Sequence, residues 1–189
     1  MEILKNFLQT QINTYSKPNN IEITFGRTVG ENIFKTIYQE NNEIEFINLI
    51  KPFRNYKLSY SQGKEYQFNN LVLRTYNNKY NQILKRSTLE TEVITFPEYQ
   101  LQVCNVDISV VEEFPLSKDY HQEELFEEVN IHLNPESHDQ LLIFQKKGDL
   151  YSLKIQLLLD VNLPYKHLDN LVDGVEKILE ILKEMDFKM

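Results

Sequence analysis

The chain has no tryptophan and no alanine, a single cysteine, five glycines and six prolines among its 189 residues. A lone cysteine excludes an internal disulfide and a cysteine-based zinc site, so Cys104 indicates a reducing compartment such as the cytoplasm and is expected to be a small buried hydrophobe. No apolar run approaches the roughly 18–20 residues of a membrane span. The first six residues also lack the basic and apolar regions of a signal peptide. We therefore expect a cytoplasmic protein with no membrane contact.

Most catalytic signatures are absent as well. No two glycines have the spacing of a GxGxxG or GxxxxGK phosphate-binding loop. Cys104 has no positioned base beside it, which argues against a nucleophile. The acidic run from Glu123 to Glu128 is interpreted as a solvated helix turn or strand edge. The histidines show no HExxH pattern and are expected to be solvated loop residues: His121, His132, His138 and His167.

Acidic residues outnumber basic ones, with 28 Asp and Glu against 20 Lys and Arg and a formal net charge of −8. This balance excludes general coating of DNA or RNA, because such binding requires a basic face. It leaves room for a local basic tunnel inside an acidic shell. The composition is 41% apolar and 25% charged, with no linker or repeat, and predicts one globular domain over residues 1–189.

The spacing of apolar residues predicts three helices. Apolar residues from Ile3 to Ile12 follow helical spacing, and Pro18 prevents that helix from continuing. A second helix is predicted over residues 32–48. A third apolar face runs from Leu168 to Leu182, directly after Pro164.

Between these helices the sequence alternates with the period of two that is typical of strands. Ile21, Ile23 and Phe25 alternate with Glu22 and Thr24, which therefore share one face. Further strands are predicted in segments 56–60, 66–68, 71–73, 83–87, 92–96, 99–111, 127–133, 140–145 and 151–161, with turns at Gly63, Asn77–Lys79 and Lys147–Asp149. About eight or nine antiparallel strands with helices at both ends predict an α+β fold, built on a closed or nearly closed barrel.

Several strands carry polar residues in a characteristic order. Asn20-Ile21-Glu22-Ile23-Thr24-Phe25-Gly26 follows the first helix, and Tyr99 to Glu112 precedes Leu150-Tyr151-Ser152-Leu153-Lys154-Ile155-Gln156-Leu157. This layout resembles the triphosphate tunnel metalloenzymes, in particular the RNA 5′-triphosphatases of mRNA capping in large DNA viruses and fungi. The resemblance covers nearly the whole chain. It implies an eight-stranded barrel in which glutamates bind Mg²⁺ or Mn²⁺ and basic side chains hold the triphosphate.

The family motifs are degenerate here. The opening Glu-x-Glu-x-Arg pattern falls on Asn20, Glu22 and Thr24, and the closing Glu-x-Glu-x-Glu pattern falls on Ser152, Lys154 and Gln156. Glu112 stands where the family has a strand lysine. The resemblance leaves Glu22, as a weak metal ligand, and Asp107 as acidic tunnel candidates. The candidate phosphate-binding residues are Arg74, Lys85, Arg86 and Lys154.

These exchanges predict weak metal binding. Five family glutamates become one carboxylate and one ammonium, so the charge of the cluster changes from about −5 to 0. The period of two predicts Ser152, Lys154 and Gln156 on one face of the sheet, and only one of Lys85 and Arg86 inside the barrel. The family topology that the resemblance implies places Glu22 on the same side. The first hypothesis is a catalytically impaired tunnel-fold protein. It would serve a viral capping or transcription complex as an accessory or subunit, bound to a protein partner and to a phosphate or an RNA 5′ end.

Two alternatives stay open. An active metal-dependent RNA triphosphatase would need replacement carboxylates, for which the candidates are Glu45, Glu65, Glu90, Glu92 and Glu98. A structural or interaction protein with an unrelated barrel would carry Glu22, Arg74 and Lys154 on solvent faces. The bias toward Asn, Ile and Lys indicates an AT-rich genome, such as that of a large DNA virus, a cytoplasmic plasmid or an AT-rich microbe. A viral protein would be found in the host cytoplasm or the virion.

Overall fold

The computed structural model describes residues 1–15, 19–31, 33–36, 56–76, 80–97, 99–113, 122–133, 140–147, 150–159 and 165–184. Its elements are, in chain order, α1 (Glu2–Thr14), β1 (Asn19–Val29), β2 (Ile33–Thr36), β3 (Tyr56–Phe68), β4 (Leu71–Tyr76), β5 (Tyr80–Thr95), β6 (Gln100–Val110), β7 (Gln122–Leu133), β8 (Gln140–Lys147), β9 (Leu150–Leu159) and α3 (Tyr165–Glu184). No helix in these ranges is both long enough and apolar enough to cross a membrane.

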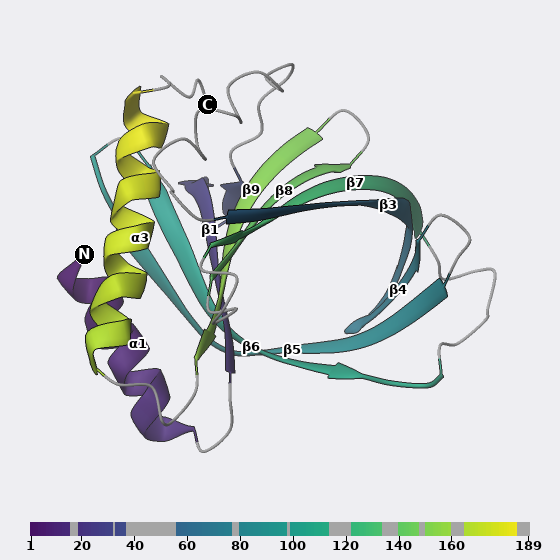
Figure 1. Cartoon of the computed structure of the whole chain (residues 1–189), viewed down its shortest axis with the longest axis horizontal. Coiled ribbons are helices and arrows are strands. Elements are labelled where there is room, and N and C mark those ends of the chain that lie inside the picture. The colour runs from purple at the N-terminus through teal and green to yellow at the C-terminus, as the bar shows by residue number, and fades with distance from the viewer. Residues whose placement is uncertain are drawn as a thin grey trace.

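The strands of the described ranges form one antiparallel sheet that curls around on itself (Figure 1). Their order is β2-β1-β6-β5-β4-β3-β7-β8-β9, and β9 also pairs with β1. That second pairing runs from Asn19 to Thr24, whereas Gly26 to Val29 of β1 pair with β2 instead. The two ends of the sheet therefore meet along only part of β1. The predicted α+β class and antiparallel sheet are confirmed, and the predicted barrel is supported in part.

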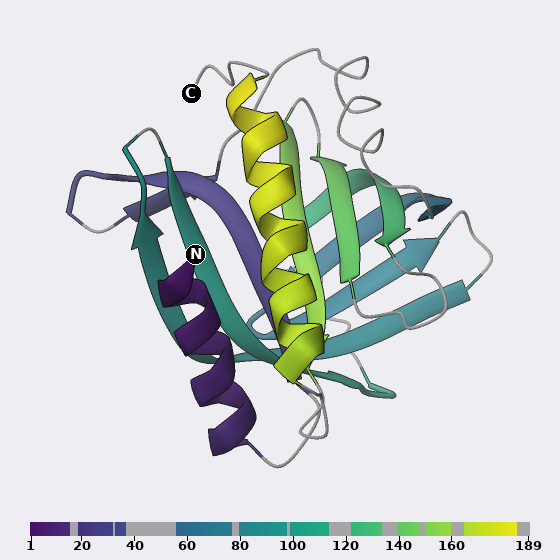
Figure 2. The same cartoon turned by 60° about the vertical axis from the view of Figure 1, so that its left-hand side comes forward.

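Both terminal helices lie on the same side of the sheet, outside the curl (Figures 1 and 2). α1 buries Leu4 and Leu8, which are one helical turn apart. α3 buries residues at intervals of three and four: Leu168, Leu171, Val172, Val175, Ile178 and Leu179. An ion pair of 2.6 Å between Lys5 Nζ and Asp169 Oδ1 links the two helices at the surface. The predictions for both terminal helices are confirmed.

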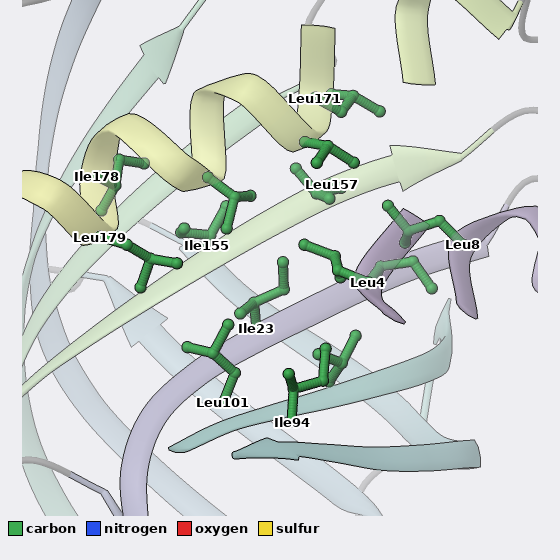
Figure 3. Close-up of a cluster of buried hydrophobic side chains, with 14 of the residues drawn as sticks. Leu4, Leu8, Ile23, Ile94, Leu101, Ile155, Leu157, Leu171, Ile178 and Leu179 are labelled. Atoms are coloured by element: carbon green, nitrogen blue, oxygen red, sulfur yellow. The ribbon is translucent and has the colours of Figure 1, made fainter. Parts of the chain in front are cut away.

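The main hydrophobic core lies between these helices and the outer face of the sheet, by which we mean the face that contacts α1 and α3 (Figure 3). It contains Ile21 and Ile23 of β1, Leu101 and Val103 of β6, and Ile155 and Leu157 of β9. Each such side chain contributes roughly 1.5–3 kcal/mol on burial. Because neighbouring residues of a strand point to opposite faces, Glu22 and Thr24 must lie on the other, inner face.

The predicted helix over residues 32–48 is wrong at its start. Residues 33–36 form β2, which pairs with β1 through Val29↔Ile33 and Gly26↔Thr36. Gly30 at the turn has a φ of +63°, a conformation that glycine adopts at no steric cost. Pairing with a strand that already has a buried face outweighs the helical spacing of these residues. Residues 37–48 lie outside the described ranges, as do Asn77–Lys79 and the end of the turn predicted at Lys147–Asp149.

The turn predicted at Gly63 is also wrong, because β3 continues through this residue to Phe68. The chain reverses instead at Asn69, whose φ is +52°. Gly63 is needed for a different reason. A Cβ atom placed on it would lie 1.9 Å from the backbone oxygen of Thr75 on the neighbouring strand β4. Only a residue without a side chain allows the two strands to approach so closely.

We therefore expect Gly63→Ala to lower the free energy of unfolding by about 3 kcal/mol, because the backbone of β4 must move to admit one methyl group. Gln62→Ala, at the exposed neighbouring position, is the matched control and should change little. Urea unfolding of the three proteins measures the difference. Equal stability of Gly63→Ala and the wild type would contradict this account of the β3–β4 contact.

Candidate functional site

The inner face of the sheet carries charged side chains from seven different strands. The strand register places them on one continuous face, because directly paired residues point to the same side. Thus Glu22 pairs with Gln156 and Thr24 with Lys154, across β1 and β9. The buried carboxylates of this face and their basic partners are Glu22, Glu65, Glu128, Arg74, Arg86, Lys147 and Lys154.

The first cluster is centred on Glu22, which is only 6% exposed. The Nζ of Lys154 lies 3.2 Å from Glu22 Oε2, and the guanidinium of Arg86 binds the same oxygen. Lys154 comes from β9, which pairs with β1, and Arg86 comes from β5, which lies on the far side of β6 from β1. Beside them, the Nε2 of Gln156 donates to Asn20 Oδ1 at 3.2 Å. The predicted grouping of Glu22 and Lys154 is therefore present in the structure.

Lys154 lies in an environment that disfavours its own charge. Burial lowers the pKa of its ammonium below the ordinary value of 10.5; Glu22 opposes this, and the nearby charges of Arg86 and Arg74 lower the pKa further. Two cations share one carboxylate in this cluster, which leaves one positive charge without a matching acid. A cluster with this imbalance attracts anions.

The second cluster joins four other strands and is balanced. Arg74 of β4 donates from Nε to Glu65 Oε2 at 2.8 Å and lies 3.0 Å from Glu128 Oε1 through Nη2. The Nζ of Lys147 lies 2.6 Å from Glu65 Oε1 and 3.8 Å from the more exposed Glu124. Gln145 Nε2 donates to Glu128 Oε1 at 2.5 Å. Two buried carboxylates and two cations thus satisfy one another.

The pKa shifts in this cluster follow from that arrangement. Burial raises the pKa of Glu65, but attraction to Arg74 and Lys147 outweighs it, so the pKa falls below the ordinary value of 4.5. Burial likewise disfavours the charged form of Arg74, yet Glu128 and Glu65 raise its pKa above the ordinary value. The guanidinium also lies 5.0 Å from the centre of the buried Phe126 ring, within the range of a cation–π contact.

These residues do not fit a divalent metal ion. A hard cation such as Mg²⁺ or Mn²⁺ requires several oxygen ligands, chiefly carboxylates. Glu22 offers one carboxylate, and Lys154 and Arg86 already bind it. Among the residues that the structure describes, no group of three or more His, Cys, Asp or Glu side chains could hold a metal. The described residues of the inner face therefore do not supply a ligand set for such an ion.

Strand alternation separates the predicted basic residues. Arg86 pairs with Ile108 on the inner face, whereas Lys85 pairs with Ser109 and is exposed on the outer face. The expectation that one of the two points inward therefore holds for Arg86, and Lys85 is corrected to an outer position. Arg74 does point inward, but Glu65 and Glu128 occupy its guanidinium.

Asp107, predicted as an acidic residue of the tunnel, lies on the wrong face. Cys104 of β6 pairs with Glu22 and so points inward. Asp107 is three residues further along the strand, which turns its exposed side chain outward. Cys104 itself is half-buried on the polar inner face, with its Sγ 3.5 Å from Thr91 Oγ1, rather than a buried core hydrophobe.

Of the replacement carboxylates considered from the sequence, only Glu65 is found on the inner face. Glu90 and Glu92 pair with the outward residues Asn105 and Val103. Glu45 and Glu98 lie outside the described ranges.

Sequence reasoning missed two members of the second cluster. Glu128 lies in β7, as the strand predicted over residues 127–133 requires, but the prediction of a solvated acidic run is wrong for this residue, which is only 6% exposed. The available signal was the alternation of Phe126, Glu128 and Asn130. Lys147 was assigned to a turn but ends β8. The histidine prediction is also corrected: His132 is in β7 and His167 in α3, whereas His121 and His138 lie outside the described ranges.

Comparisons with known proteins show the fold. No protein-family model and no curated protein sequence matches the chain. The S. pombe RNA triphosphatase Pct1 matches with a TM-score of 0.60 and 11% identity, over 98% of this chain and 89% of that one. Pct1 in complex with the Spt5 CTD matches with a TM-score of 0.60 and 12% identity, over 98% and 90%. The Mimivirus capping enzyme triphosphatase matches with a TM-score of 0.58 and 7% identity, over 95% and 96%. The structural neighbours are thus RNA triphosphatases, and at these identities the likeness concerns the fold alone.

We expect Arg74→Met to lower the free energy of unfolding by about 3 kcal/mol, because Glu65 and Glu128 then lose their shared cation. Lys147 and Gln145 remain as partners and keep the loss near the low end for a buried pair. Lys64→Met is the control. It removes a cation from an exposed pair with Glu123 and should leave the denaturant midpoint unchanged. Similar effects of the two variants on urea unfolding would contradict the greater contribution that we assign to the buried cation Arg74.

The lowered pKa of Glu65 has a consequence for acid stability. A carboxyl whose pKa is lower in the folded state stabilises the fold above its unfolded pKa, and this contribution is lost as the pH falls through the folded value. Wild-type stability should therefore drop on acidification below about pH 4.5. Glu65→Gln should be less stable at neutral pH and should show a flatter pH dependence. Parallel pH profiles of unfolding free energy for the two proteins would rule out this role.

Proposed function

We propose that the chain is a divergent protein of the triphosphate tunnel fold, one domain over residues 1–189. In this proposal its inner face holds the 5′-triphosphate end of an RNA and does not hydrolyse it by a metal-dependent route. The observation that carries the proposal is the Glu22 cluster, in which two cations share one carboxylate. The fold of the solved RNA triphosphatases supports it.

The basic residues of the Glu22 cluster suit a multiply charged phosphate. A guanidinium presents a planar fork of donors that matches two phosphate oxygens, and an ammonium adds three donors of its own. The side chains of Arg86 and Lys154 remain 40% and 29% exposed, so a ligand can reach them without unfolding the sheet. Arg74 and Lys147 are engaged by Glu65 and Glu128, so the second cluster adds no excess of positive charge.

The alternative of an active metal-dependent triphosphatase is less well supported. It requires carboxylates that are free to bind Mg²⁺ or Mn²⁺. Each of the three buried carboxylates on the described inner face is paired with at least one cation. An ion entering the site would have to displace Lys154 and Arg86 from Glu22, at the cost of leaving both cations unpaired.

A role in mRNA capping or transcription as an accessory or subunit is the context that we propose. The S. pombe neighbour was solved in complex with the Spt5 CTD, which supports a protein partner for this chain as well. The bias toward Asn, Ile and Lys fits an AT-rich genome such as that of a large DNA virus, a cytoplasmic plasmid or an AT-rich microbe. For a viral source, the location that we propose is the host cytoplasm or the virion.

Binding of short RNAs that share one sequence and differ only at the 5′ end tests the proposal. We expect the 5′-triphosphate RNA to bind more tightly than the 5′-monophosphate and 5′-hydroxyl RNAs, as measured by fluorescence anisotropy. Arg86→Gln should weaken triphosphate binding about tenfold or more through the loss of a charge-assisted contact. Lys85→Gln is the matched control: it makes the same charge change on the adjacent outer position and should bind as the wild type does.

Phosphate release from the same RNA in the presence of Mn²⁺ tests the second part of the proposal. We expect no release above that of the RNA alone. Equal binding of the triphosphate and hydroxyl RNAs would refute the proposal that the inner face recognises the 5′-triphosphate. Turnover that Glu22→Gln abolishes would refute the claim of lost hydrolysis and would support the enzyme alternative.

A further inference from the structure

The geometry points to a replacement of the divalent metal by the protein's own side chains. We infer that Lys154 Nζ and the Arg86 guanidinium act at Glu22 as fixed organic cations, so that the inner face binds its anion without Mg²⁺ or Mn²⁺. This inference rests on the proposed function and adds the source of the positive charge. It also assigns Glu22 the role of a positioning residue rather than of a metal ligand.

The charge count supports this replacement. One divalent ion bound to one carboxylate leaves a net charge of +1. Two monovalent cations on one carboxylate leave the same charge, and in this structure both bind a single oxygen, Glu22 Oε2. The carboxylate thus brings an ammonium from β9 and a guanidinium from β5 together, although the two residues lie far apart in the sequence.

A purely structural ion pair does not account for this stoichiometry. A buried carboxylate is satisfied by one cation, as charge neutrality requires, and a second cation adds a desolvation cost and a repulsion. The repulsion is visible in Lys154, where burial and the charges of Arg86 and Arg74 together disfavour the ammonium. An additional anion removes this repulsion. In the second cluster two buried carboxylates face two cations, and the more exposed Glu124 lies beside Lys147, so no cation there is in excess.

The surroundings of Glu22 also lack the ligands that would attract a competing metal ion. In the described part of the sheet, the inner positions next to it are Asn20 and Thr24 on β1, Cys104 on β6 and Gln156 on β9, none of which is a carboxylate. Asn20 and Gln156 bind each other, so their amide groups are partly satisfied. A divalent ion finds one carboxylate and two positive side chains at this position, and electrostatic repulsion keeps it out.

Calorimetric titration with inorganic tripolyphosphate tests the inference on the full chain. Wild-type affinity should be the same in EDTA and in MnCl₂, after correction for the Mn²⁺ that the tripolyphosphate itself binds. Lys154→Gln should weaken binding about tenfold or more. Binding that requires Mn²⁺ would overturn the inference and leave the anion site standing, whereas no binding in either condition would overturn the proposed function as well.

Glu22→Gln separates the two roles of this carboxylate by the sign of its effect. Gln at this position keeps an oxygen that can accept from Lys154 and Arg86 but removes the negative charge that repels the anion, so Glu22→Gln should strengthen tripolyphosphate binding about tenfold. As a metal ligand Glu22 would be required, and the same change would weaken binding. Glu92→Gln, which removes an exposed carboxylate from the outer face of β5, controls for the general loss of negative charge.

Glu22→Gln can be less stable than the wild type, because Lys154 and Arg86 then lose their shared carboxylate, and thermal unfolding tests the inference in that case. Tripolyphosphate should raise the melting temperature of this variant more than that of the wild type, since the ligand replaces the missing charge. A smaller rise than in the wild type would overturn the inference.

Restoring the family glutamates should give the protein a metal site that the wild type lacks. The combined variant Asn20→Glu, Lys154→Glu and Gln156→Glu supplies four carboxylates at neighbouring inner positions and removes one cation. We expect it to bind Mn²⁺ alone, measured by electron paramagnetic resonance, whereas the wild type does not. Equal Mn²⁺ binding by the wild type would contradict the replacement.

Discussion

The structure depends on β1 being packed on both faces. Its outward residues Ile21 and Ile23 are fully buried under the helices, while Glu22 between them is 6% exposed on the inner face. A strand with one apolar and one charged buried face tolerates no shift in register, because a slip of one residue would exchange the two sets of side chains. It would place a carboxylate in the helix-covered core, where no cation could reach it.

The inner carboxylates in turn connect strands that the chain order keeps apart. Glu22 meets Lys154 across 132 residues, Glu65 meets Lys147 across 82, and Arg74 meets Glu128 across 54. A buried ion pair adds little net stability compared with a well-packed apolar pair, but an unpaired buried charge is strongly unfavourable. These contacts therefore select one curvature and one register of the sheet more than they strengthen it. The helical layer supplies the apolar burial that stabilises the fold.

What the sequence could predict follows from how local each signal is. Helical spacing identified α1 and α3, and the period of two placed Ser152, Lys154 and Gln156 on one face, because both patterns are properties of a single element. The placement of Glu22 on that face came from the family resemblance, because it joins two different strands. The prediction for Asp107 was wrong because the sequence does not show the register between β1 and β6, in which Glu22 pairs with Cys104. Gly63 was assigned to a turn because its requirement comes from the backbone of β4. The burial of Glu128 could not be predicted from its acidic neighbours, because it depends on an ion pair with Arg74 on another strand.

The distribution of charge over the whole chain restricts what can bind to it. The formal net charge is −8, whereas the Glu22 cluster carries one positive charge in excess. An acidic exterior repels the phosphate backbone of a long nucleic acid, so contact along its length is unfavourable. A chain end concentrates three phosphoryl groups in a small volume and can enter a curled sheet that an uninterrupted duplex cannot. For the proposed function, a net negative exterior with an excess positive charge at Glu22 favours an end of an anionic chain over its middle, whether or not the bond is cleaved.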